Sequence, residues 1–236
     1  MYDFLDNLTI RGWVGAFLIV VPITTVMGMF TGGFLGSSVV GAVIGLAVGL
    51  LEGLIAVLVS RRESWRTLLA NAPVLLAGLV AGVLFGGGLL SQLWMNQAWI
   101  ASPPSSFELI QPPIGNGLNA FFILFNSLME WALIPAAIVF NWRIPKRRTL
   151  IIAAAVIYYG MRVWTYVYFA PEIMTFYEIP SSGPFSPELA ERAQQWVYLS
   201  WYRVAIDGLV NLLFFLAAFI PGSSSAEKFP ETKDEH

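Results

Sequence analysis

Residues 37–60 read SSVVGAVIGLAVGLLEGLIAVLVS, and Glu52 is the one ionisable side chain among them. A helix needs about 20 mostly apolar residues to cross the hydrocarbon core of a bilayer, and this stretch meets that requirement. Five further stretches resemble it in length and composition: residues 11–32, 67–95, 117–141, 149–170 and 196–220. The sequence therefore predicts an all-α, polytopic transmembrane bundle of about six helices.

Composition supports a lipid environment for most of the chain. The 236 residues are 57% hydrophobic and 12% charged, with a mean hydropathy of +0.68, whereas a soluble domain carries about 25% charged residues.

No dense basic patch is present, so nucleic acid is excluded as a partner. There is no Cys, and the single His is His236. Metal or haem sites built from these residues and a Ser-His-Asp triad within the bilayer are therefore excluded, and we expect no cofactor.

The basic residues indicate an orientation. They gather in the second-to-third and fourth-to-fifth connections and near the two ends: Arg11, Arg61, Arg62, Arg66, Arg143, Lys146, Arg147, Arg148, Lys228 and Lys233. The opposite connections carry only Arg192. Cytoplasmic loops are enriched in Lys and Arg, so the sequence predicts an even number of spans with both termini cytoplasmic. We expect the protein in a plasma membrane, the inner membrane in a bacterium.

Three regions are expected along the chain. Residues 1–66 form an N-terminal transmembrane hairpin, residues 67–220 a four-helix transmembrane domain, and residues 221–236 a disordered polar tail. Ser186, followed by Pro187 and Glu188, is typical of a helix start, so the last helix should begin outside the lipid.

Glycines recur every four residues in two of the predicted helices. Gly41, Gly45, Gly49 and Gly53 form one ridge, and Gly78, Gly82 and Gly86 form another. Such ridges allow helix backbones to approach closely. The ridges predict packing within the chain, and the alternative is a contact surface for a homodimer or a partner membrane subunit.

Five charged residues fall inside the predicted spans: Glu52, Glu130, Arg162, Arg203 and Asp207. Each charge near the bilayer centre costs about 2.5–3.5 kcal/mol on insertion scales. These side chains should therefore face a protein interior or a wet cavity.

Three spans each present a polar stripe at helical spacing. The stripes comprise Asn126 and Glu130, then Tyr158 and Arg162, and finally Arg203, Asp207 and Asn211. Together they predict one polar intramembrane site, which is the candidate for binding a substrate. No metal site is predicted, and no catalytic residue is identified.

A structural role is the competing interpretation of these charges. Arg203 and Asp207 would pair on one helix, and Arg162 would pair with Glu130. Three acids then face two arginines, so one carboxyl group lacks a partner. Glu52 is the candidate because it is farthest from the arginines, and it is the predicted protonatable group.

Residues from about 75 to 220 resemble the anthrone-oxygenase-like integral membrane family, most of whose members have no assigned function. The resemblance is carried by the order of several segments: the glycine-rich run GLVAGVLF from Gly78 to Phe85, Pro103-Pro104 ahead of Phe107, Leu109 and Gln111, Phe169-Ala170-Pro171, Ser186 to Ala190, and then Arg192, Trp196 and Arg203. It implies a four-helix bundle and, in a few members, oxidation of polycyclic phenols without metal or flavin.

Three functions compete at this stage. A bundle that binds or oxidises a hydrophobic small molecule would use the two arginines with Trp164, Tyr166, Trp201 and Tyr202. A small proton-coupled transporter would use Glu52, Glu130 and Asp207. An accessory or assembly subunit would use its glycine ridges as contact surfaces. The sequence does not decide whether the protein is an enzyme.

Overall fold

The computed structural model describes residues 2–34, 36–59 and 63–221, with the side chains of residues 17–33, 36–55, 58 and 67–221. All regular structure in these residues is helical, and no strand occurs among them. The predicted all-α class is therefore confirmed.

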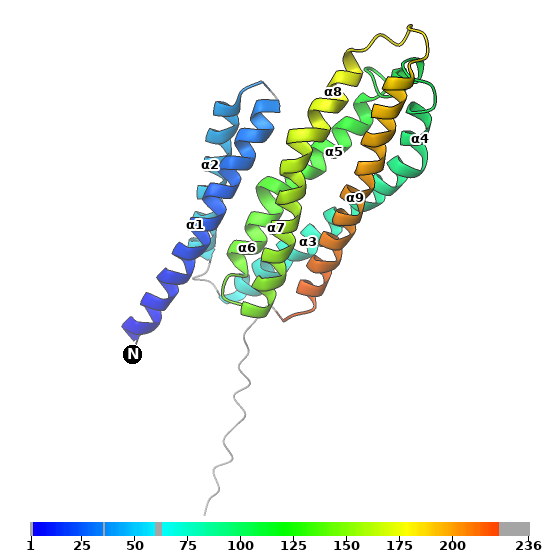
Figure 1. The fold of residues 1–236 in the computed structure, drawn as a ribbon. Helices are drawn as coiled ribbons and strands as arrows, with labels where there is room; N and C mark the ends of the chain where they lie inside the picture. Colours follow the sequence, from blue (N-terminus) through cyan, green and yellow to red (C-terminus); the bar gives the residue numbers. More distant parts are fainter. Residues whose placement is uncertain (1, 35, 60–62, 222–236) are drawn as a thin grey trace, which may run out of the picture.

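The helices make six antiparallel passes (Figure 1). The first two passes are α1 (Tyr2–Phe34) and α2 (Ser38–Val59), and the third joins α3 (Glu63–Leu90), the π turn η1 (Ser91–Met95) and α4 (Asn96–Trp99). The fourth joins α5 (Asn116–Leu128), the π turn η3 (Met129–Leu133) and α6 (Ile134–Phe140). The fifth joins α7 (Pro145–Trp164), the π turn η4 (Thr165–Phe169) and α8 (Ala170–Glu178), and the sixth is α9 (Pro187–Ala218). By length and composition five passes are able to span a bilayer, and the first contains a shorter apolar stretch, Phe17–Gly33.

Several helices are longer than the apolar stretches that predicted them. The first begins at Tyr2 instead of residue 11, and the fifth pass continues to Glu178 instead of residue 170. Hydropathy marks only the part of a helix that lies in hydrocarbon, while the hydrogen-bonded backbone continues into the polar interface. The start of α9 was predicted correctly, because the Ser186 side chain caps the helix by accepting a hydrogen bond from Leu189 N at 3.3 Å.

A tight turn at Gly36 and Ser37 joins α1 to α2. Gly36 adopts φ +107°, a left-handed conformation that glycine reaches without a steric penalty. Ser37 N donates a hydrogen bond of 2.7 Å to the Gly32 carbonyl across the turn.

The basic connection that the structure describes, between α6 and α7, lies at one end of the bundle (Figure 1). Figure 1 shows the start of α1, the turn between α6 and α7, and the end of α9 together at that end. This agrees with the predicted even number of passes; the side of the membrane stays a prediction. Arg61, Arg62, Lys228 and Lys233, the side chains of Arg11 and Arg66, and the tail after residue 221 lie outside the described residues.

Arg147 was predicted among the residues flanking the membrane at this end, but it is a buried side chain. Its exposed fraction is 0%, and its Nη1 donates a hydrogen bond of 2.8 Å to Asn71 Oδ1 on α3. The guanidinium group thus contacts the third pass, a contact that charge counting along the chain could not predict.

The glycine ridge of α2 packs against α1. A Cβ atom on Gly41 would lie 2.6 Å from Gly32 Cα, and one on Gly45 would overlap the Thr24 carbonyl. The second ridge is used in part: Gly82 packs against Asn211 of α9, whereas Gly86 has no neighbouring atom within 4 Å of where a Cβ would be. Packing within the chain therefore accounts for the first ridge.

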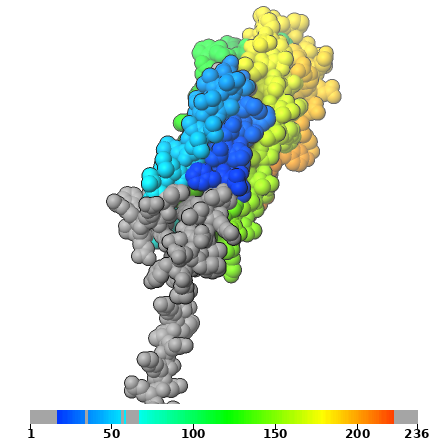
Figure 2. Space-filling model, turned by 90° about the vertical axis from the view of Figure 1, so that its left-hand side faces the viewer, coloured from blue at the N-terminus to red at the C-terminus, as the bar shows by residue number. Residues whose placement is uncertain are grey.

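The hydrophobic core is formed mainly by α3, α6, α7 and α9. Its fully buried members include Val74, Ile134, Ile151, Ala154 and Phe214. The α1–α2 hairpin packs chiefly on itself and reaches the remaining helices through α6 and η3. Figure 2 shows the blue hairpin lying across one face of the molecule, beside the yellow-green fifth pass.

The opposite end of the bundle carries a compact cap. It consists of the loop between α4 and α5, which holds the 3-10 helix η2 (Ser105–Leu109), together with α8 and the start of α9. Four aromatic side chains form its core: Trp99, Phe107, Phe176 and Trp196. Gln111 Nε2 ties the loop to α8 through a hydrogen bond of 2.8 Å to the Ile179 carbonyl.

Candidate functional site

Three passes are interrupted by π turns, at η1, η3 and η4. A π turn holds one residue more than an α-helical turn and frequently occurs at functional sites. In η3 and η4 the turn is followed two residues later by a proline, Pro135 and Pro171 respectively. Proline has no N–H, so it cannot donate to the carbonyl five residues earlier.

At η3 a tyrosine supplies the missing donor. The carbonyl five residues before Pro135 is that of Glu130, and the Tyr159 hydroxyl donates a hydrogen bond of 2.8 Å to it. The π turn is therefore held by a side chain from α7 and places the Glu130 side chain inside the bundle.

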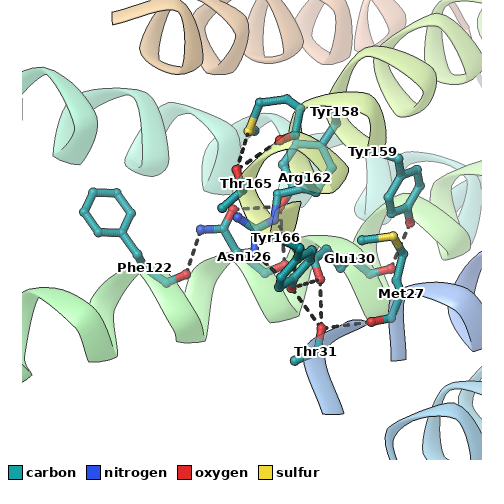
Figure 3. A network of polar contacts seen from close by, with 11 residues as sticks. Met27, Thr31, Phe122, Asn126, Glu130, Tyr158, Tyr159, Arg162, Thr165 and Tyr166 are labelled. Carbon is teal, nitrogen blue, oxygen red and sulfur yellow. Dashed lines mark hydrogen bonds and ion pairs between the residues drawn. The ribbon is translucent and has the colours of Figure 1, made fainter. Parts of the chain in front are cut away.

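Glu130 and Arg162 form a buried ion pair between the fourth and fifth passes. The exposed fraction of Glu130 is 0%. Tyr166 donates a hydrogen bond of 3.0 Å to Glu130 Oε2 and accepts one of 3.0 Å from Arg162 Nη2. The predicted pairing of Arg162 with Glu130 is thus present (Figure 3).

The first helix joins this network through Thr31. Its Oγ1 lies 2.9 Å from the Tyr166 hydroxyl and 3.3 Å from Glu130 Oε2, and Figure 3 shows it approaching from α1. The Phe30 ring stacks on Tyr166, with ring centroids 5.7 Å apart. The hairpin is therefore docked by polar as well as apolar contacts.

Asn126 and Tyr158 form a second polar contact on the same side. The Tyr158 hydroxyl donates a hydrogen bond of 2.9 Å to Asn126 Oδ1, and Asn126 Nδ2 donates one of 2.8 Å to the Phe122 carbonyl. Both polar atoms of the Asn126 side chain therefore have a hydrogen-bond partner within the protein.

Above this network lies a cavity of about 420 Å³, enclosed by α5, the fifth pass, the third pass and α9. Its volume falls in the range of about 300–1,000 Å³ that is usual for small-molecule sites. Ile123 of α5 and Met174 of α8 both line it and are 47% and 43% exposed, so the cavity opens sideways between these helices. At its outer end the Tyr177 hydroxyl bridges to Asn119 Oδ1 at 3.0 Å.

One face of α9 presents to this cavity polar groups that lack a hydrogen-bond partner among the described residues. Ser200, Arg203 and Asp207 all line it. Ser200 Oγ and Arg203 Nε are buried without a hydrogen bond. In the described part of the chain, Asp207 takes part in no hydrogen bond or ion pair shorter than 4 Å. The Arg203 guanidinium carbon lies 4.5 Å from the centroid of the Phe169 ring.

The predicted pairing of Arg203 with Asp207 does not take the form of a direct ion pair in the described residues. The two residues are four apart on α9, but each side chain faces the cavity and no ion pair within 4 Å joins them among the described residues. A spacing of four residues permits the pair, but in the structure both side chains line the cavity beside α9 instead.

The other predicted site residues divide into two groups. Asn126 and Arg162 line the cavity, whereas Glu130 and Tyr158 lie behind its wall. Asn211 is not part of the cavity, because it packs on Gly82. A role of these residues in binding a substrate stays a prediction.

Of the four predicted aromatic neighbours, three do not line the cavity. Trp201 and Tyr202 do not line the cavity and are 38% and 51% exposed on the outer face of α9. Trp164 does not line it either, whereas Tyr166 does.

Sequence reasoning missed several polar residues of the site. Gln92 and Asn96 line the cavity and are linked by a hydrogen bond of 2.9 Å from Asn96 Nδ2 to Gln92 Oε1. Their spacing of four residues inside an apolar stretch was the available signal. Ser200 and Thr31 gave no comparable signal in the sequence, because isolated hydroxyl side chains in a membrane helix usually form hydrogen bonds with the backbone of their own helix.

Glu52 lies elsewhere, in a groove of about 270 Å³ between α2, α3 and the fourth pass. Its Oε2 is buried without a hydrogen-bond partner in the described structure. Glu52 was predicted to be the unpaired acid, but Asp207 also lacks a partner, so two of the three intramembrane acids are unpaired.

In the part of the chain that the structure describes, no three His, Cys, Asp or Glu residues gather in a way that could hold a metal ion. Comparison with known proteins adds no further assignment: no family model, curated protein or solved structure matches the chain. The chain is therefore characterised by its fold and its site, as a helical, multi-pass integral membrane protein with a partly polar cavity.

Proposed function

We propose that this protein binds an amphipathic small molecule in the cavity beside α9. The observation that supports the proposal is a row of polar groups on one face of that helix. Ser200 Oγ and Arg203 Nε are buried without a hydrogen bond, and the Asp207 side chain lines the cavity beside them. Leaving a buried polar group without a partner costs about 1–3 kcal/mol. A ligand that satisfies these groups recovers this free energy on binding.

The chemistry of the row indicates the head group of the ligand. Arg203 and Ser200 donate hydrogen bonds, while Asp207 accepts one. A head group with an acceptor oxygen and a proton to donate, such as a carboxylic acid or a phenol, satisfies both. Apolar side chains including Phe122, Ile123 and Ile173 line the remaining wall and suit a hydrophobic body.

The family resemblance is consistent with this ligand class. A polycyclic phenol, the class that some anthrone-oxygenase-like proteins oxidise, would place its hydroxyl group at Arg203 and Asp207. Oxidation of such a ligand by this protein is a further proposal, and no catalytic residue is assigned to it.

We further propose that both termini are cytoplasmic and that the protein resides in a plasma or inner membrane. The basic turn between α6 and α7 supports this orientation.

The alternative functions have less support. A proton path for a transporter would connect the three intramembrane acids, but Glu52 and Asp207 lie in two separate cavities and Glu130 is held in an ion pair. An accessory subunit would use free contact ridges, but the ridge of α2 is occupied by α1, and the ridge of α3 is open only at Gly86.

Native mass spectrometry of the intact protein tests the binding proposal. The wild type, purified in a mild detergent, should retain a small-molecule mass that Arg203→Met and Ser200→Leu lose. Arg192→Met is the matched control, because Arg192 lies in the outer cap and pairs with Glu172 at 2.8 Å. Retention of the same mass by Arg203→Met would contradict the proposal, and a stoichiometric second polypeptide would favour an accessory role.

A further inference from the structure

The groove at Glu52 is separate from the cavity beside α9. It lies between α2, α3 and the fourth pass, and the two sites share no lining residue. Its walls include Ile55, Pro73, Leu76, Ala136 and Phe140. Apart from Glu52 every side chain that lines it is apolar, so a single carboxyl group faces a hydrocarbon-like space.

One oxygen of that carboxyl group has no hydrogen-bond partner in the described structure. Glu52 Oε2 is buried and accepts no hydrogen bond, and no basic side chain lines the groove. A carboxyl group among apolar walls would be stabilised by a hydrogen-bond donor, and that donor has to come from outside the described chain.

Pro73, which lines the same groove, deprives one backbone carbonyl of α3 of its usual helical donor. Proline lacks an N–H, so it cannot donate to the carbonyl four residues earlier, which is that of Leu69, a residue lining the groove. The next carbonyl, of Ala70, accepts a replacement hydrogen bond of 3.0 Å from Asn141 Nδ2. No side chain among the described residues provides such a replacement for Leu69.

We propose that this groove is a binding site for a lipophilic primary ammonium compound. The ammonium group donates one hydrogen bond to Glu52 and another to the Leu69 carbonyl, and its alkyl chain lies along the apolar walls. Glu52 is about two turns from the end of α2 at Val59, and α2 runs toward the end of the bundle at which the basic turn between α6 and α7 lies (Figure 1). The head group of a membrane-inserted amphiphile reaches this depth from the interface. The inference is independent of the ligand proposed for the other cavity.

Binding of labelled dodecylamine to the full chain in phosphatidylcholine nanodiscs tests the site. We expect saturable binding of one amine per chain, weakened about tenfold or more in Glu52→Gln, since a charge-assisted hydrogen bond is lost. Glu108→Gln is the matched control: it removes the same charge from an exposed position in the outer cap and should bind like the wild type. Dodecanol should not compete, and dodecyltrimethylammonium, which has no N–H, should compete less well than dodecylamine.

A second variant guards against a Glu52 substitution that fails to fold. Ala136→Phe keeps the carboxyl group but fills the groove, and it should also bind at least about tenfold less amine. The proposal is overturned if the wild type shows no saturable binding, or if folded Glu52→Gln or Ala136→Phe binds like the wild type. Competition by dodecanol equal to that by dodecylamine, or loss of amine binding in Arg203→Met alone, would overturn it as well.

Discussion

At the scale of single residues, the ion pair between Glu130 and Arg162 has the largest expected effect on stability. Both side chains are buried in the bundle and bonded to Tyr166. Removing one partner of a buried pair leaves an uncompensated charge, which costs about 3–5 kcal/mol in proteins. We therefore expect Arg162→Met to lower the free energy of unfolding by about that amount, measured by denaturant unfolding in lipid bicelles.

Two comparisons give this prediction its controls. The double variant Glu130→Met/Arg162→Met carries no buried charge and should be far more stable than the sum of the single changes suggests. Arg192→Met breaks the pair with Glu172 in the outer cap, where the two side chains are 38% and 23% exposed, and should cost less than about 1 kcal/mol. Equal losses from Arg162→Met and Arg192→Met would contradict the argument.

The residues of the candidate site were predictable where they carry charge. An arginine or carboxyl group inside an apolar stretch has to face the protein interior, and this located Glu130, Arg162, Arg203 and Asp207. Which of them pair was not predictable, because pairing depends on the rotation of each helix and on the space beside it. Asn211 shares the periodicity of Asp207, yet it faces α3 instead of the cavity.

At the scale of helices, the contact between α1 and α2 depends on glycine. Gly41 lies against the backbone of Gly28 and Gly32, so any side chain there pushes the two helices apart. We expect Gly41→Leu to destabilise the chain by about 1–3 kcal/mol or more, as overpacking does in well-packed cores. The lowered melting temperature should be measured against Gly86→Leu, whose position is open and which should melt like the wild type.

The helices were predictable in number but not in detail. Apolar stretches of sufficient length gave the passes, and Ser186 with Pro187 gave the start of α9. The π turns were not predictable, since the extra residue is accommodated only where another element satisfies the backbone. The Tyr159 hydroxyl on the Glu130 carbonyl is such a case, and no local pattern near Pro135 shows that this tyrosine will be adjacent.

At the scale of the whole molecule, the arrangement of loops predicts a labelling pattern. The chain contains no Cys, so single cysteines can be introduced without a background. Ser182→Cys lies in the outer loop before α9, and Lys146→Cys lies at the start of α7, both at exposed positions. An impermeant maleimide should label Ser182→Cys in intact cells and Lys146→Cys only after permeabilisation.

The outcome of that labelling also tests the number of passes. Reversed labelling would show that the termini face outward, which contradicts the proposed orientation. One membrane crossing, the fifth pass, separates the two labelled positions. Labelling of both positions in intact cells would therefore contradict this arrangement. The arrangement of the cavity could not be predicted at this scale, because its walls come from helices that are far apart in the sequence.

The sideways opening between α5 and α8 has a consequence for thermodynamics. A ligand that arrives through it is drawn from the bilayer and not from water, so its partition coefficient enters the apparent affinity. Eight methylene groups favour transfer into hydrocarbon by about 6 kcal/mol, which concentrates a solute on the order of 10⁴-fold. The apolar body of the ligand gains little further free energy by moving from lipid to protein, because both environments are apolar. Discrimination between one amphiphile and the next is therefore expected to reside in the head group, where Arg203, Asp207 and Ser200 lie.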